Sequence, residues 1–203
     1  MFRDFSLAMG TIAIFCATGT ACAQQAPSAA AAPPQPQQAS EPQVRSVQYQ
    51  DWFYRCVDMK AADGTIVPNC EVAQVAQVKQ GDTDVNVLTL AIAPTALDPV
   101  KKDKKQAPDL LLTALVPLNI FLPSGFLIEA DGSSITEISY RNCNEAGCWA
   151  QQKLDAKVVS ALQKGTSGGA RLRLMNGQNI NIKFSLKGLT DALIALQKPM
   201  ISQ

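Results

Sequence analysis

The sequence predicts a mainly β, antiparallel β-sandwich-like single domain with one or two short helices, one of them C-terminal, and two disulfides. Three observations predict this fold class. Several short stretches alternate apolar and polar side chains with the period of a half-buried strand. Turn-forming Gly, Pro, Asn and Asp residues separate these stretches. Four of the six cysteines lie between residues 56 and 148, an even number suited to pairing.

The first predicted strand covers residues 50–58, where Trp52, Tyr54 and Cys56 alternate with the side chains between them. Residues 72–78 fit either a strand or a helix, and we favour a strand. Pro117 and Pro123 exclude a continuous helix through the apolar stretch 110–132, which we interpret as two strands around a Pro-Ser-Gly turn. Two further alternating stretches predict strands, at residues 85–93 and 134–141.

The clearest local prediction is a hairpin across residues 170–186, because Asn176-Gly177 is a strong turn signal. A three-residue loop, Met175 to Gly177 with Gly177 left-handed, keeps the apolar side chains of both arms on one face. Apolar residues at helical spacing predict a short helix over 153–164 that ends at Gly165, and a final helix after Gly188.

The first part of the chain predicts export. Residues 5–19 are apolar and lead to Ala21-Cys22-Ala23, so we expect residues 1–23 to be a cleaved signal peptide. The alternative is a lipoprotein anchored to the outer membrane through Cys22. Residues 24–47 are rich in Ala, Pro and Gln and predict a disordered tether, and residues 48–203 form the β domain. No integral membrane span is expected in the mature chain.

The cysteines of the predicted domain indicate a disulfide framework in an oxidising compartment. Four cysteines permit three connectivities, and the turn-rich segments within each neighbouring pair favour Cys56 with Cys70 and Cys143 with Cys148. A four-cysteine zinc site is the alternative, although the spacings match no common zinc motif. We expect no bound metal and no cofactor.

The sequence contains no histidine, which excludes a Ser/His/Asp triad, a Cys/His dyad and a histidine-ligated metal. The near balance of 18 basic and 17 acidic residues argues against nucleic-acid binding. An alternative enzymatic hypothesis is an envelope carbohydrate hydrolase with paired carboxylates. Its candidates, which we interpret as surface charges, are Asp51, Asp58, Glu71, Glu129, Asp131 and Glu137. We interpret Trp52 and Trp149 as core aromatics rather than ligand platforms.

A lysine-rich loop is predicted near the middle of the chain. Four lysine side chains of this loop could bind peripherally to an anionic membrane, although a solvated loop is the simpler interpretation. These are Lys101, Lys102, Lys104 and Lys105.

The order of short motifs resembles that of the invasion-associated locus B protein family of Gram-negative bacteria. The resemblance covers about residues 50–197, with two small departures at Asn119 and Leu189. The matching motifs are Trp52 before Cys56, Asp63-Gly64-Thr65, Pro68 before Cys70, Val116-Pro117-Leu118, Leu122-Pro123 with Gly125, Asp131-Gly132, Tyr140-Arg141 before Cys143, Gly147-Cys148 before Ala150, and Ser185-Leu186 with Gly188.

The resemblance implies an exported, non-enzymatic protein of the periplasm, with outer-membrane association as a variant. Such a protein has a binding or structural role in envelope integrity or in host-cell invasion and hence virulence. It implies an envelope or host protein as partner. The family provides no catalytic residues to transfer, so we expect no enzyme and assign a structural role to the four cysteines alone.

Overall fold

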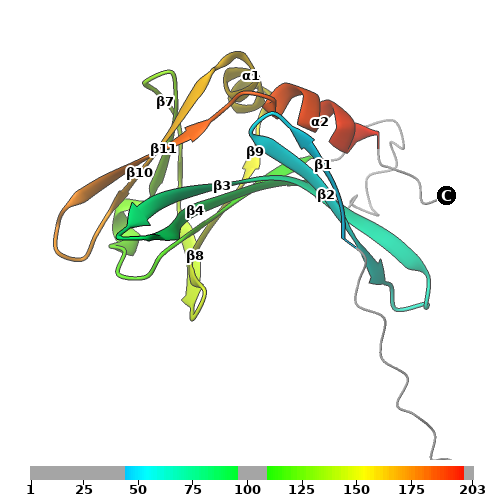
Figure 1. Cartoon of the computed structure of the whole chain (residues 1–203), viewed down its shortest axis with the longest axis horizontal. Helices are drawn as coiled ribbons and strands as arrows, with labels where there is room; N and C mark the ends of the chain where they lie inside the picture. The colour runs from blue at the N-terminus through cyan, green and yellow to red at the C-terminus, as the bar shows by residue number, and fades with distance from the viewer. Residues whose placement is uncertain (1–43, 96–108, 199–203) are drawn as a thin grey trace, which may run out of the picture. The chain divides into compact units, whose positions relative to one another are not determined.

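The computed structural model describes residues 44–95 and 109–198, which form two antiparallel β-sheets with two α-helices (Figure 1). One sheet has seven strands in the order β1-β2-β3-β4-β5-β9-β8. Their bounds are β1 Val44–Tyr49, β2 Trp52–Lys60, β3 Ile66–Gln80, β4 Thr83–Pro94, β5 Leu110–Val116, β9 Gly147–Leu154 and β8 Tyr140–Asn144. The predicted β-sandwich-like class, with a C-terminal helix and two disulfides, is confirmed.

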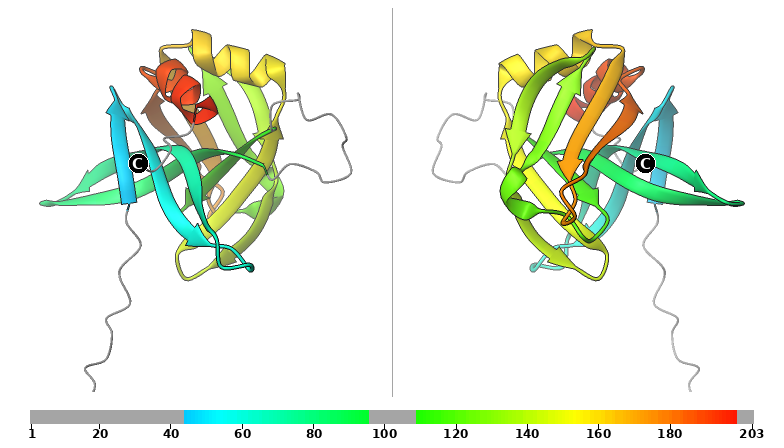
Figure 2. Two further views of the ribbon diagram at one scale, coloured as in Figure 1. Left: turned by 90° about the vertical axis from the view of Figure 1, so that its right-hand side faces the viewer. Right: turned by 90° about the vertical axis from the view of Figure 1, so that its left-hand side faces the viewer.

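The second sheet has four strands in the order β11-β10-β6-β7. Their bounds are β11 Asn179–Ser185, β10 Ser167–Arg173, β6 Phe126–Ala130 and β7 Ser133–Ile138. A 3-10 turn, η1 (Leu122–Ser124), precedes β6 at the predicted Pro-Ser-Gly turn. The α-helices are α1 (Ala156–Lys164) and α2 (Leu189–Gln197), and Figure 2 shows both at the same end of the sheets.

The core lies between the inner faces of the two sheets, where alternate residues of the central strands, such as β4, β5 and β6, are buried. Trp52, Tyr54 and Cys56 are almost fully buried, as the alternation in β2 predicts. Phe126 and Ile128 of β6 enter the same core from the second sheet. Burying such large apolar side chains stabilises the fold by roughly 2 to 3 kcal/mol each before ordering costs are considered.

Two hydrogen bonds connect the seven-stranded sheet to β11, and a third, from Gln74 to the residue before β2, holds the connecting side chain in place. The indole of Trp52 donates Nε1–H to the carbonyl of Ser185 over 2.9 Å. Gln74, the buried polar residue of β3, accepts from the Ser185 backbone N–H over 2.9 Å and donates to the carbonyl of Asp51 over 2.7 Å. Since a buried amide must be satisfied, Gln74 specifies how β3 and β11 meet.

The two disulfides join directly opposed residues of neighbouring strands. Cys56 of β2 is paired with Cys70 of β3, and Cys143 of β8 with Cys148 of β9. Each bridge therefore closes one hairpin, as the local pairing predicts. The first lies in the core, whereas Cys143 is exposed at the edge strand.

The predicted hairpin has the register that its apolar pattern requires. Leu172 is opposite Ile180, and Gly177 has φ 86° in the loop that follows Leu174. The stretch 134–141, predicted as one strand, is instead two: β7 ends at Ile138 in the four-stranded sheet, and β8 starts at Tyr140 in the seven-stranded sheet. The chain therefore changes sheets at Ser139.

Two boundaries differ from the sequence analysis. Strand β1 begins at Val44, within the last residues of the predicted tether, because its backbone pairs with β2 along residues 52–57. Helix α1 begins at Ala156 rather than at 153, because β9 continues to Leu154 and Asp155 caps the helix. Across the described ranges, neither helix has the length and apolar content needed to cross a bilayer.

Candidate functional site

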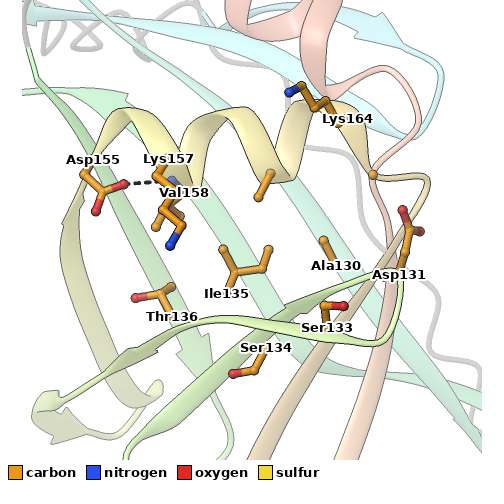
Figure 3. Close-up of a pocket in the computed structure, with 12 residues that line it drawn as sticks. Ala130, Asp131, Ser133, Ser134, Ile135, Thr136, Asp155, Lys157, Val158 and Lys164 are labelled. Atoms are coloured by element: carbon orange, nitrogen blue, oxygen red, sulfur yellow. Dashed lines mark hydrogen bonds between the residues drawn. The ribbon is translucent and has the colours of Figure 1, made fainter.

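A groove of about 430 Å³ lies between helix α1 and strand β7 (Figure 3). Its floor contains the apolar side chains of Ile135 and Val158, and its rim is polar. The polar lining consists of Asp131, Ser133, Ser134, Thr136, Asp155, Lys157 and Lys164. Such a combination of apolar floor and polar rim suits a small ligand or a short segment of a partner.

Local sequence rules position both walls of this groove. Asp155 caps α1, since its carboxylate accepts the backbone N–H of Val158 over 2.7 Å. Lys157 and Lys164 are seven residues apart, about two helical turns, so their backbones lie on the same side of α1, and Figure 3 shows that the Lys157 side chain points into the groove whereas that of Lys164 turns away from it. Asp131 has φ 47° and Gly132 has φ 79°, and this left-handed pair makes the tight turn from β6 to β7.

Asp131 is held by the loop that follows α1. Its carboxylate accepts the backbone N–H of Ser167 over 2.9 Å and the backbone N–H and hydroxyl of Thr166, each over 3.1 Å. These bonds, that of the Ser167 N–H above all, lower the pKa of Asp131 below its ordinary value. The ionised carboxylate therefore closes the end of the groove as a structural acceptor.

The remaining free groups of the groove are cationic or neutral. Among the described residues, the ammonium groups of Lys157 and Lys164 form no ion pair, whereas the carboxylates of Asp131 and Asp155 are occupied by backbone donors. The groove is thus better suited to holding an acidic or hydroxyl-bearing group than to acid–base catalysis.

The carboxylates considered for a hydrolase are distributed over both sheets, and several are paired with arginine. Asp58 accepts from Arg45 over 2.6 Å, and Glu71 accepts from Arg55 over 2.5 Å. These arginines are the partners that sequence reasoning did not assign. The others are Glu129, paired with Arg171 between β6 and β10, Asp131 in the turn, Asp51 before β2 and Glu137 in β7.

Two motifs of the sequence have a structural explanation. Asp63 accepts the backbone N–H of Thr65 over 2.9 Å and its hydroxyl over 2.6 Å, which lowers the pKa of Asp63 and stabilises the β2–β3 turn. Tyr140 packs edge-to-face on Phe126 at 6.3 Å, and burial raises the pKa of Tyr140 to about 12. Neither group lies in the lining of the groove.

A second depression, of about 420 Å³, lies over strands β5, β9 and β8. It is lined by Thr113, Arg141, Asn142, Asn144, Trp149 and Gln151. Trp52 is buried, as expected for a core aromatic, but Trp149 is only partly buried and points away from the core. The sequence feature that indicates the outward direction of Trp149 is its position between Cys148 and Ala150, because side chains alternate along a strand and both neighbours point inward.

The cysteines are the predicted site residues that the structure brings together, as two disulfides. In the described part of the chain, no cluster of three or more His, Cys, Asp or Glu side chains is arranged to hold a metal ion. Cys22 and the lysine run, Lys101, Lys102, Lys104 and Lys105, lie outside the described residues. Lipidation and peripheral membrane association therefore remain predictions.

Comparisons with known proteins agree on one family. The model of the family described as Invasion associated locus B (IalB) protein matches residues 52–197. Two invasion protein B homologs of Brucella abortus, from strain 2308 and from biovar 1 strain 9-941, are each 28% identical over 150 residues, covering 73% of this chain and 77% of the relative. The crystal structure of invasion associated protein B from Bartonella henselae matches with a TM-score of 0.58 at 20% identity, covering 76% of this chain and 99% of that chain.

Proposed function

Because the chain belongs to the Invasion associated locus B family, we propose that it is an exported, non-enzymatic protein of the periplasm or cell envelope. Its role is to bind a partner or to support the envelope, in envelope integrity or in host-cell invasion. The observation that carries this proposal is the family match over residues 52–197, a range that includes both disulfides.

The disulfides support export, since such bonds persist in the periplasm and outside the cell and are rare in the cytosol. The apolar stretch 5–19 and the Ala21-Cys22-Ala23 sequence supply a matching signal. A binding role, rather than hydrolysis, is supported by the carboxylates of Asp58, Glu71 and Glu129, which are occupied by arginine.

Export is tested by fractionating cells of the native organism and by mass spectrometry of the purified protein. We expect the mature chain in the periplasmic fraction, beginning at Gln24, with no thiol that reacts before reduction. A diacylglyceryl mass on Cys22 would replace the free periplasmic form with the lipoprotein alternative. Recovery from the cytosol with reactive thiols at Cys56 and Cys70 would refute export.

The role itself is tested with a deletion strain complemented by the wild-type gene or by the Asp58→Asn and Glu71→Gln variants. We expect the deletion to reduce resistance to envelope stress or entry into host cells, and both variants to restore it. Failure of one carboxylate variant to complement, although it accumulates as a folded and oxidised protein, would favour the hydrolase hypothesis. A deletion strain with no defect in either assay would refute the role.

A further inference from the structure

The depression over β5, β9 and β8 lies on the outer face of the seven-stranded sheet. Cys148 and Ala150 of β9 are buried in the core, so Trp149 and Gln151 point to the opposite face. Trp149 is paired across the sheet with Leu115 on one side and Asn142 on the other. The indole therefore lies in the middle of three strands rather than at a mobile loop.

The polar groups beside Trp149 are fixed by the sheet register. Gln151 is opposite Thr113 and donates to its hydroxyl over 3.0 Å, while Arg141 donates Nη1–H to the amide oxygen of Gln151 over 2.9 Å. The β8–β9 register shifts between Tyr140 and Asn142, which places Arg141 where it reaches Gln151. This chain of hydrogen bonds holds the guanidinium in place before any ligand binds.

Several polar groups of the depression keep hydrogen-bonding capacity that no residue in the described ranges uses. Within residues 44–95 and 109–198, Arg141 forms no ion pair, and neither the amide of Asn142 nor the indole N–H of Trp149 forms a hydrogen bond. No carboxylate of the described part of the chain lines the depression. The surface thus offers one aromatic ring, neutral donors and acceptors, and one guanidinium with free N–H groups.

These groups match the chemistry of a sugar ring. The apolar C–H face of a pyranose stacks on the electron-rich face of an indole, and amide side chains exchange hydrogen bonds with its hydroxyl groups. Gln151 is two residues from Trp149 along the strand, about 7 Å, which is close to the width of one sugar ring. An acidic substituent of a ring on Trp149 is then within reach of Arg141.

A single-stranded nucleic acid also stacks on aromatic rings, but it requires a series of cations to follow its phosphates. Among the residues that the structure describes, Arg141 is the one cationic side chain in the lining. The depression therefore favours a glycan over a nucleic acid.

We propose that this depression binds a glycan, with a pyranose ring stacked on Trp149 and a carboxylate of the same or the next sugar bound to Arg141. The proposal deepens the binding role proposed above by naming its ligand class. Acidic sugars of this kind occur as muramic acid in bacterial envelopes and as uronic acids on host cells.

The test uses the oxidised mature protein, titrated with defined tetrasaccharides while amide and indole NMR signals and tryptophan fluorescence are recorded. The probes are a tetrasaccharide of alternating N-acetylglucosamine and N-acetylmuramic acid, a uronic-acid tetrasaccharide, and neutral chitotetraose. We expect at least one acidic probe to bind saturably and to shift the signals of Trp149, Asn142 and Gln151, and chitotetraose to bind more weakly. The acidic probe that binds more tightly shows whether the glycan comes from the bacterial envelope or from the host cell.

Matched variants separate recognition from folding. Trp149→Leu retains an apolar contact with Leu115 but removes the stacking face, and Arg141→Gln removes the charge from an exposed position. Each is expected to weaken binding by about tenfold or more. Lys183→Gln, at an exposed position of β11 in the other sheet, removes one charge and is expected to leave affinity unchanged. If Trp149→Leu fails to fold, Trp149→Phe replaces it. Trp149→Phe is expected to keep part of the affinity, and Arg141→Gln is then the second variant of the test.

Three results would overturn the proposal. The first is no saturable shift of the Trp149 indole with either acidic probe at millimolar concentration. The second is binding that Arg141→Gln and Lys183→Gln weaken equally, which indicates general charge attraction. The third is tighter binding of a single-stranded oligonucleotide at the same residues. None of them alters the fractionation result, so failure here is distinguishable from failure of the proposed export.

Discussion

Removing the core disulfide is expected to destabilise the protein more than removing the edge disulfide. Cys56 and Cys70 are 14 residues apart, and a closed loop of this size stabilises by about 3 kcal/mol in the chain-entropy account. Cys143 and Cys148 are 5 residues apart, for which the same relation gives about 2 kcal/mol. In this account the loop-closure entropy of the unfolded chain depends only on loop length, so the two disulfides differ in their stabilisation by about 1 kcal/mol.

Burial increases the difference. Cys56 is 0% exposed and Cys70 is 7% exposed, so replacing both with alanine leaves a void in the core. Cys143 is exposed, and only Cys148 of the second pair is buried, so that replacement disturbs less packing. We therefore expect C56A/C70A to lose about 3 to 4 kcal/mol and C143A/C148A about 2 kcal/mol.

The measurement is urea unfolding followed by far-UV circular dichroism, with melting temperatures as a second readout. For a domain of this size, C56A/C70A is expected to melt about 6 to 16 °C below the wild type. Reduced wild-type protein is the control, and it should be less stable than either variant. A greater loss from C143A/C148A, or an intact disulfide between Cys56 and Cys143 in the wild type, would refute the reasoning.

Further predictions concern single residues. Gln74→Leu is expected to cost about 2 kcal/mol in urea unfolding, because the half-buried Ser185 N–H loses its acceptor. Gly188→Ala should cost roughly 2 to 4 kcal/mol and lower the melting temperature, because φ is 85° and the new Cβ would lie 2.0 Å from the carbonyl oxygen of Tyr49. Because the pKa of Asp131 is lowered in the folded protein, its carboxylate stabilises the fold fully above the unfolded-state pKa, and this contribution is lost as pH falls through the folded-state pKa. Asp131→Asn should remove this part of the pH dependence, which is measured by urea unfolding at a series of acidic pH values.

The parts of the fold that local chemistry determines were predictable. Alternation placed Trp52 and Tyr54 of β2 in the core, because a strand with one buried face requires a period of two. The Asn176-Gly177 signal and the apolar pattern of its two arms were sufficient to select a three-residue loop with the observed register. In these segments the information lies within a few residues.

The parts that depend on distant partners were not predictable in the same way. Residues 134–141 alternate without interruption, yet β7 and β8 belong to different sheets. An alternating pattern identifies which face of a strand is buried but not which strand is its neighbour, since apolar side chains from either sheet satisfy it. The groove between α1 and β7 depends on this change of sheets, so its lining could not be assembled from the sequence.

The outward position of Trp149 follows from the covalent framework more directly than from its own side chain. Cys148 forms its disulfide on the core side of β9, and Ala150 is fully buried on the same side. With both neighbours held inward, the alternation of the strand leaves the large indole between them on the outer face. A tryptophan on the outer face gives up packing that an inward tryptophan would gain, and the fixed Gln151–Arg141 pair beside this half-buried ring suits it to recognition.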